Sequence, residues 1–486
     1  EKNITYGRGS HAEGTYTVAY ATYSHAEGTY TVAYGDYSHA EGTYTVAYAA
    51  YSHAEGNETL AYGNYSHAEG YETITYGEAS HAEGFTNIAY VDYSHVEGYN
   101  NTTYGGVSHA EGFGNITYGK ESHVEGNNNI TYGMSSHAEG TENITYADYS
   151  HAEGHQSKAA GQYSHVEGYD AYTSAYYYDK HYQYDGLYSH AEGVSSRVFG
   201  AFSHAEGYQS VSYGDGSHVE GRSNEARGNY SHAEGSGTKA KGSWSHSEGL
   251  ETQANGDITH AEGYGTKANG EGSHAEGLNT IANQNYTHAE GRYTRAWGLG
   301  SKSEGYGCEA SGTGAHAEGY ISYTGGDYAH AEGRIAAAKG WYSHAEGYNS
   351  YAIGICSHAE GVKTYSAMPY THAEGMGTYA GANNSHTEGQ YTATYDASAH
   401  AEGASTVAYT KYSHAEGVKT IAYGVGSHTQ GECTVAYNYY EAALGRFNVS
   451  TKDKTILSVG NGNDKNRSNA FELQNNGVAY VQNDLY

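Results

Sequence analysis

The sequence repeats one motif, Ser-His-Ala-Glu-Gly, every 14 residues along most of its length. The motif histidine occupies positions 11, 25, 39 and 53, continues in steps of 14 to position 165, resumes at 190 and ends at 428. Of these 30 positions, 29 hold histidine, and Lys302 is the exception. A short, fixed period is typical of a solenoid, in which each repeat buries its faces only against neighbouring repeats. The sequence therefore predicts a solenoid.

The residue pattern within one repeat predicts two short strands and two turns. We number 14 slots from the motif serine, so that residues 24–37 form one complete repeat. Slots one, three, five, eight, ten and twelve hold mostly small residues. Because alternate side chains of a strand point to opposite faces, the small side chains can face each other inside a thin roll. The glycines at slots five and twelve suit bends that need a positive φ.

We therefore expect an all-β chain with about 30 coils, one coil for each 14 residues. Parallel pairing of neighbouring coils about 4.8 Å apart would give a rod roughly 140 Å long. The roll is expected over residues 1–437, with an insertion at about 169–188 because His165 and His190 lie 25 positions apart. Residues 438–486 leave the repeat and are expected to form a small β cap.

The thin roll predicts an oligomer. Its small interior side chains bury little apolar area, and three chains around an axis suit a rod packed along its length. Slots two and four are nearly uniform, whereas slots nine and eleven vary between repeats. A repeated interface tolerates less variety than a solvated face, so we place the slot-two and slot-four side chains between chains. The first members of this interface ladder are His11, Glu13, His25, Glu27, His39, Glu41, His53 and Glu55.

The chemistry of the ladder favours a structural role. A motif copied 29 times is typical of architecture, and glutamate can accept hydrogen bonds from imidazole between chains. No acid/base pair stands apart from its copies, and no Walker loop, HExxH, CxxC or Gly-x-Ser-x-Gly motif occurs. We expect no enzyme activity from the repeat, no cofactor and no dedicated metal site. The imidazoles and carboxylates of the ladder could nevertheless act as ligands for an ion on the trimer axis.

Two resemblances follow from these motifs. The 14-residue pattern resembles the left-handed parallel β-roll in the heads of trimeric autotransporter adhesins, which repeat Ser-Val-Ala-Ile-Gly. The present chain has His and Glu where that family has Val and Ile. The Ser-His-Ala-Glu-Gly form is similar to repeats of phage tail-fibre and tailspike proteins. These resemblances cover residues 6–437 and imply a left-handed roll in a homotrimer, although fold does not imply function.

The tail carries a further resemblance. Its segments Val459-Gly-Asn-Gly, Arg467-Ser-Asn-Ala-Phe and Asn476-Gly resemble the C-terminal autoproteolytic domain of phage tailspikes, the peptidase G2 type. In that family a C-terminal chaperone segment is released after trimer assembly. The resemblance therefore implies self-cleavage in the C-terminal domain as the only enzymatic activity expected of this chain. No cleavage nucleophile can be assigned in this chain, and a structural cap that ends the solenoid is the alternative interpretation.

Two surface features depart from the uniform repeat. Slot eleven holds tyrosine in eleven consecutive repeats, at 6, 20, 34, 48, 62, 76, 90, 104, 118, 132 and 146. Stacked rings at strand spacing stabilise a sheet face, and they can also stack on sugars or support bundling of fibres. The insertion is rich in tyrosine, and loops on rigid scaffolds often carry recognition. Its candidate receptor-binding residues are Tyr172, Tyr176, Tyr177, Tyr178, Asp179, Tyr182 and Tyr184; a local bulge or trimer clasp is the alternative.

Composition restricts the partners. The net charge of −31 with neutral histidines argues against nucleic acid, and no 18-residue apolar run is present to insert in a membrane. Asn-x-Thr triplets, such as that at Asn115, recur through the repeat and are weak indicators of glycosylation. We expect a structural fibre on a virion tail or another extracellular surface, namely a phage tail fibre that binds a host glycan or receptor. The alternatives are a bacterial surface adhesin or self-assembling filament and, less favoured, a depolymerising tailspike enzyme.

Overall fold

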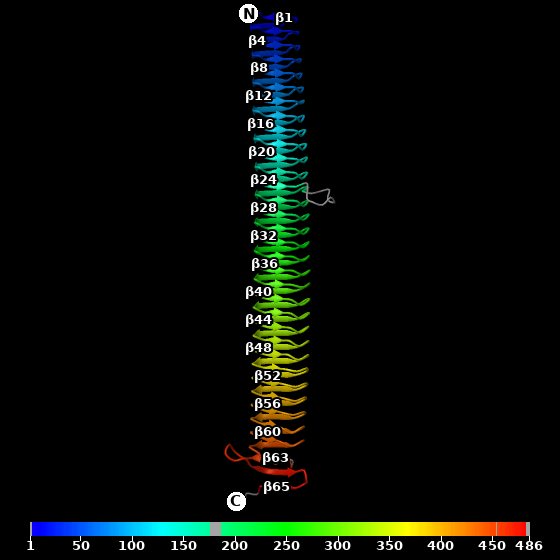
Figure 1. Ribbon diagram of the computed structural model, residues 1–486, viewed down its shortest axis with the longest axis vertical. Helices are drawn as coiled ribbons and strands as arrows, with labels where there is room; N and C mark the ends of the chain where they lie inside the picture. The colour runs from blue at the N-terminus through cyan, green and yellow to red at the C-terminus, as the bar shows by residue number, and fades with distance from the viewer. Residues whose placement is uncertain (1, 175–185, 453, 483–486) are drawn as a thin grey trace. The chain divides into compact units, whose positions relative to one another are not determined.

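The chain forms an all-β solenoid with a 14-residue repeat and about 32 turns, as the sequence predicts. The computed structural model describes residues 2–174, 186–452 and 454–482. It divides into two compact units, Glu1–Leu250 and Glu251–Tyr486. Within each unit the coils stack one upon the next, each contributing one long and one short strand (Figure 1). Among the residues described, no helix has the length and apolar character needed to cross a bilayer.

The strands follow the repeat. In the first unit the long strands run from β2 (His11–Thr15) to β34 (His246–Leu250), each spanning slots two to six. The short strands of that unit run from β1 (Ile4–Thr5) to β33 (Lys239–Ala240), each spanning slots nine and ten. The second unit has the same pattern, from β36 (His260–Tyr264) to β62 (Ala442–Arg446) for long strands and from β35 (Gln253–Ala254) to β61 (Val435–Ala436) for short strands.

Long strands pair with long strands, and short strands with short strands. The pairing is parallel and joins equal slots; His53 of β8 (His53–Asn57), for example, pairs with His67 of β10 (His67–Tyr71). Each unit therefore has two parallel sheets that face each other. Towards the C-terminus, β63 (Thr455–Asn461) still pairs in parallel with β62. The last strands, β64 (Asn469–Gln474) and β65 (Ala479–Val481), pair antiparallel.

The interior consists of small side chains, as expected. In the repeat 24–37, Ser24, Ala26, Thr31 and Ala33 are fully or almost fully buried. The serine hydroxyl is satisfied locally, because Ser24 Oγ donates to Ala21 O at 2.8 Å. All three cysteines are free, and Cys308 lies in the interior of the second unit. Backbone pairing and alanine contacts, rather than large apolar side chains, fill the roll.

The turns differ from the sequence prediction. Slot-five glycines do adopt positive φ, as at Gly28, but the slot-twelve glycine Gly35 does not lie in the left-handed region. A Cβ at Gly35 would instead clash with the carbonyl group of Ala49 in the next coil. The left-handed residues at the bends occupy slots seven and fourteen, where Tyr30 and Tyr37 have φ of 60° and 59°. The prediction that slot-twelve glycine supplies a positive φ is therefore wrong: at Gly35 glycine allows close approach of the next coil, and alanine occupies the same slot at Ala49.

The Asn-x-Thr triplets also have a structural explanation. Asn115 is fully buried inside the roll. Its Nδ2 donates to Glu111 O and to Gly126 O at 2.9 Å, and its Oδ1 accepts from Asn129 N at 2.8 Å. Equivalent asparagines stack above and below it as an internal ladder. The side chain is therefore inaccessible to a glycosyl group, and the indication of glycosylation is wrong at this position.

We predict that Asn115→Ala destabilises the first unit by about 1–3 kcal/mol, because it leaves buried backbone groups without partners. Asn127→Ala is the matched control, since Asn127 lies at exposed slot six of β18 (His123–Asn127) and should change stability by less than about 0.5 kcal/mol. Chemical unfolding followed by circular dichroism measures both variants. Equal stabilities would contradict the internal ladder.

A second prediction concerns the bends. Val107 is a β-branched residue with φ of 59°, a conformation that costs an L-residue roughly 1–2 kcal/mol. We expect Val107→Gly to raise stability by about 1 kcal/mol, because glycine adopts this φ without steric cost. Val194→Gly, at exposed slot six of β26 (His190–Val194), should instead lower stability by roughly 0.5–1 kcal/mol. Thermal unfolding of the two variants should therefore shift in opposite directions.

Candidate functional site

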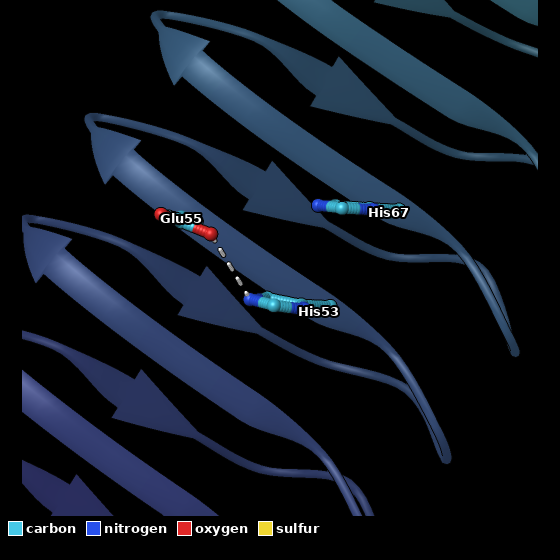
Figure 2. A group of neighbouring side chains, drawn as sticks. All are labelled: His53, Glu55 and His67. Carbon is cyan, nitrogen blue, oxygen red and sulfur yellow. Dashed lines mark ion pairs between the residues drawn. The ribbon is translucent and has the colours of Figure 1, made fainter.

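The long-strand sheet of each unit carries the His/Glu ladder, which we define as the side chains at slots two and four. These side chains point outward from the sheet, and in-register pairing places each imidazole over the next. The rings of His53 and His67 have centroids 4.6 Å apart and an interplanar angle of 7°. Figure 2 shows the two imidazoles on neighbouring strands, with Glu55 on the same strand as His53. The predicted common face is therefore present within each chain.

Histidine and glutamate of one coil lie side by side. His53 Nε2 lies 3.6 Å from Glu55 Oε2, which is longer than a normal hydrogen bond. The corresponding distances in the other predicted pairs are 3.5 Å for His11–Glu13, 3.9 Å for His25–Glu27 and 3.8 Å for His39–Glu41. The structure thus brings all eight predicted residues onto one face. Their position between chains stays a prediction.

Several ladder imidazoles are shifted towards the neutral form. Burial, together with the adjacent imidazoles of His67 and His39, lowers the pKa of His53 to about 4. Burial and the neighbouring histidines likewise lower the pKa of His109 to about 4. A neutral stack avoids repulsion between successive rings. The His53 and Glu55 side chains nevertheless keep 34% and 43% of their surface exposed, so the ladder is open to a partner.

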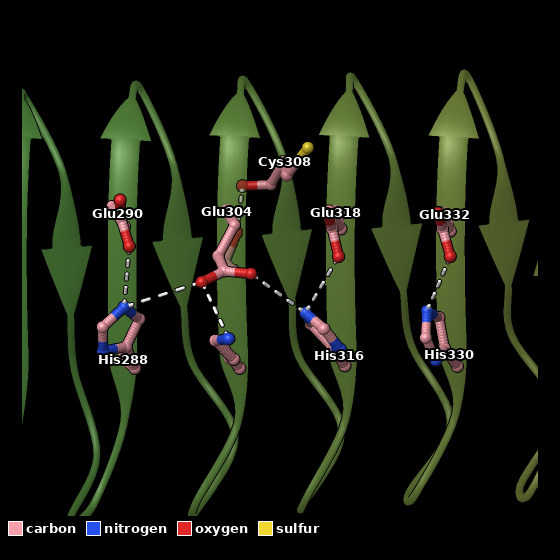
Figure 3. A network of polar contacts seen from close by, with 10 residues as sticks. His288, Glu290, Glu304, Cys308, His316, Glu318, His330 and Glu332 are labelled. Atoms are coloured by element: carbon pink, nitrogen blue, oxygen red, sulfur yellow. Dashed lines mark hydrogen bonds and ion pairs between the residues drawn. The ribbon is translucent and has the colours of Figure 1, made fainter.

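Lys302 interrupts the ladder in the second unit. Its Nζ lies 2.8 Å from Glu304 Oε1, and Glu304 Oε2 also lies 3.4 Å from Nε2 of His316 in the next coil (Figure 3). Burial tends to raise the pKa of Glu304, but the hydrogen bond and charge of Lys302 outweigh it and lower this pKa. Glu304 Oε1 also lies 3.8 Å from Nε2 of His288 in the preceding coil, so this single carboxylate joins three consecutive coils. The sequence located the exception but did not reveal the connection across coils.

The predicted tyrosine ladder is stacked. In slot eleven, the rings of Tyr20 and Tyr34 have centroids 4.6 Å apart and an interplanar angle of 6°. Two further ladders were missed, at slots seven and fourteen: Tyr16 stacks on Tyr30, and Tyr23 on Tyr37. The recurrence of tyrosine at these slots was the available signal. All three ladders are exposed, so the first coils of the chain present many aromatic rings to solvent.

The insertion contains fewer residues than the stretch of about 169–188 that the sequence predicted. Tyr172 belongs to β25 (Tyr172–Thr173), which pairs with β27 (Arg197–Val198), and its hydroxyl donates to Ser174 Oγ at 3.1 Å. The roll continues at Gly186, so the additional residues are 175–185. The other receptor candidates lie outside the described residues: Tyr176, Tyr177, Tyr178, Asp179, Tyr182 and Tyr184.

A hollow of about 740 Å³ lies on the short-strand face beside Tyr172. It forms where alanine replaces tyrosine in slot eleven, at Ala160. Its lining combines aromatic rings with charges of both signs: Tyr146, Tyr172, Phe199, Lys158, Arg197 and Asp170 are among the residues that line it. Such a combination can stack on a sugar ring and bind its hydroxyl groups.

The C-terminal region contains a buried carboxylate that sequence reasoning missed. Glu441 occupies slot one, where the repeat has serine, and is fully buried. Burial raises its pKa, although its Oε2 accepts from the backbone nitrogens of Tyr437 and Asn438, each at 2.9 Å. Among the tail motifs, Val459 lies in β63, and Arg467 Nη1 donates to Cys433 O at 2.8 Å. These contacts attach the tail to the last coils of its unit.

Comparison with known proteins gives no family for this chain. No protein-family profile matches it, and no curated protein matches it. The function must therefore be inferred from the repeat and its exposed faces.

We predict that acid weakens the fold. Because the folded pKa of His53 and His109 is about 4 and the ordinary value is 6.5, the unfolded chain binds more protons between these pH values. Their stabilising contribution should be complete above pH 6.5 and decline as the pH falls towards 4. Thermal unfolding at a series of pH values measures this. The double variant His53→Gln/His109→Gln should show a shallower decline, and a wild-type midpoint that stays constant over this range would contradict the prediction.

Proposed function

We propose that this chain is a structural subunit of an extracellular fibre that assembles as a homotrimer along its His/Glu ladder. The single observation that supports this best is the ladder itself, a half-exposed face whose repeat departs from His and Glu only at Lys302 and Gln430 among the described motif repeats. Most of its Nε2 atoms are buried and have no hydrogen-bond partner within the described chain. The glutamates beside them can bind another chain, because their carboxylates accept hydrogen bonds and 43% of the Glu55 side-chain surface, for example, is exposed.

The proposal further assigns the fibre to a virion tail, where it would attach to a host surface. A regular solenoid gives length, and similar coils cannot define a unique binding site. Specificity should therefore lie where the repeat is broken, at residues 175–185, beside the hollow near Tyr172 or in the tail. A bacterial surface adhesin or filament remains the alternative function, supported by the same repeat and by the exposed tyrosine ladders.

The oligomeric state of the purified protein tests the proposed homotrimer. Light scattering should give three times the chain mass of 52.0 kDa. The triple variant Glu41→Ala/Glu55→Ala/Glu69→Ala should weaken the trimer, since interchain imidazoles lose acceptors. Glu58→Ala/Glu72→Ala is the control, because these exposed residues lie at slot-seven bends outside the ladder. A stable wild-type monomer would reject the trimer, and equal assembly of both variants would reject the ladder as its interface.

Deletion of residues 175–185 tests attachment. Ser174 and Gly186 lie next to each other, since a Cβ at Gly186 would clash with the Ser174 carbonyl oxygen, so the deletion should preserve the roll. We expect loss of adsorption to the target surface with the oligomeric state unchanged. Unchanged adsorption would move the binding site to the tail or the hollow. Gold-labelled antibodies on native particles distinguish the two origins, because they label virion tails in one case and cell surfaces in the other.

A further inference from the structure

Among the described residues, the His/Glu ladder contains four groups of three metal-binding atoms that lie close together, two of them in the first unit. In the first unit, His53, Glu55 and His67 each offer one ligand atom, and these atoms lie within 4.8 Å of one another. His151, Glu153 and His165 form an equivalent group farther along the same unit. In each group two consecutive coils supply the imidazoles, and the first coil supplies the carboxylate (Figure 2). Two imidazoles and one carboxylate are a common ligand set of zinc.

The distances fit metal ligands better than hydrogen bonds. Nε2 and Oε2 lie 3.6 Å apart in both His53–Glu55 and His151–Glu153. Two ligands of a tetrahedral zinc ion with bonds near 2.1 Å are separated by about 3.4 Å, whereas a hydrogen bond needs roughly 3.2 Å or less. The spacing of these two atoms therefore suits an ion between them. The second imidazole is stacked on the first with ring centroids 4.6 Å apart in both groups, so it must rotate out of the stack to bind the same ion.

The imidazole nitrogens in these groups have no other use within the chain. Nε2 of His53, His67, His151 and His165 is buried, and none of these four atoms has a hydrogen-bond partner in the described structure. A buried nitrogen without a partner is costly, and a metal ion would satisfy two such nitrogens at once. This observation is independent of the spacing between ligand atoms.

We propose that His53–Glu55–His67 and His151–Glu153–His165 are binding sites for divalent transition-metal ions of the zinc class, with a fourth position left to water. Each ion would join two consecutive coils of the same chain. Bound ions would therefore stabilise the roll by mass action, since an unfolded chain does not hold the ligands together. The sites use side chains of one chain only, so they do not depend on the proposed trimer.

The Lys302 layer shows why two similar groups are excluded. The groups His288–Glu290–Glu304 and Glu304–His316–Glu318 also have convergent ligand atoms, but both contain Glu304. The Glu304 carboxylate is already paired with Lys302 Nζ at 2.8 Å (Figure 3). An ammonium group at this distance repels a metal cation and occupies the carboxylate oxygen that it needs. The Glu304 groups of the second unit can therefore be compared directly with the two proposed metal sites of the first unit.

Titration of chelator-treated protein with Co²⁺ and Zn²⁺ tests the proposal. We expect about two equivalents per chain, visible absorption bands of tetrahedral Co²⁺, displacement by Zn²⁺ and a raised melting temperature with metal. Glu55→Gln and Glu153→Gln should each remove one equivalent. The control variants Glu27→Gln and Glu97→Gln change the same ladder slot outside the two groups and should retain both equivalents.

Lys302→Ala provides the converse test, because it frees Glu304 and should add one equivalent. Absence of the tetrahedral Co²⁺ spectrum would overturn the proposal. Equal binding by all four glutamine variants would also overturn it, since it would mean general adsorption along the ladder. Light scattering on the same samples keeps this result separate from the trimer, because loss of metal binding with an intact trimer rejects only the metal sites.

Discussion

Every feature of this molecule depends on in-register parallel pairing between consecutive coils. Because the repeat is 14 residues and the pairing joins equal slots, each side chain lies over the same slot of the next coil. Identical side chains therefore often lie next to each other in consecutive coils. This arrangement favours planar rings, which can stack, and amides, which can form hydrogen bonds along the solenoid axis. Asn115 and Asn129 form hydrogen bonds in this way, and Tyr20 and Tyr34 stack their rings. In-register stacking also places side chains of like charge next to each other, so a ladder of charged histidines or glutamates would repel itself.

The ladder reduces that repulsion at the coils where burial favours a neutral imidazole. Burial and adjacent rings lower the pKa of His53 to about 4, so stacked histidines do not repel one another near neutral pH. The glutamates remain half-exposed, and their carboxylates need cations, imidazole N–H groups or other chains as partners. The interface proposal and the metal proposal are two consequences of this one requirement. At Lys302 the chain itself supplies a partner for a ladder carboxylate, because the lysine ammonium group pairs with Glu304.

The narrow interior sets the composition of the roll. Only small residues fit where two sheets face each other closely, and so alanine, serine and threonine replace the large apolar residues of a globular core. The cohesion of the coils comes mainly from backbone hydrogen bonds and from the ladders. Short bends then force residues such as Tyr30 and Tyr37 into left-handed conformations at nearly every coil. The stacked rings at these bends offset part of that cost.

The sequence by itself determined the solenoid, the inward and outward slots, the shared face of His53 and Glu55 and the slot-eleven tyrosine stack. It could do so because a fixed period and alternation along a strand leave one register. Tertiary structure decided what depends on neighbouring coils: the burial of Asn115, the contact of Glu304 with His316, and the limits of the insertion after Ser174. It also decided which slots bend: Tyr30 and Tyr37 adopt positive φ, whereas Gly35 does not and instead lies close to the next coil. Periodicity in a sequence reports which residues are equivalent, whereas the distance between coils decides what equivalent residues do to each other.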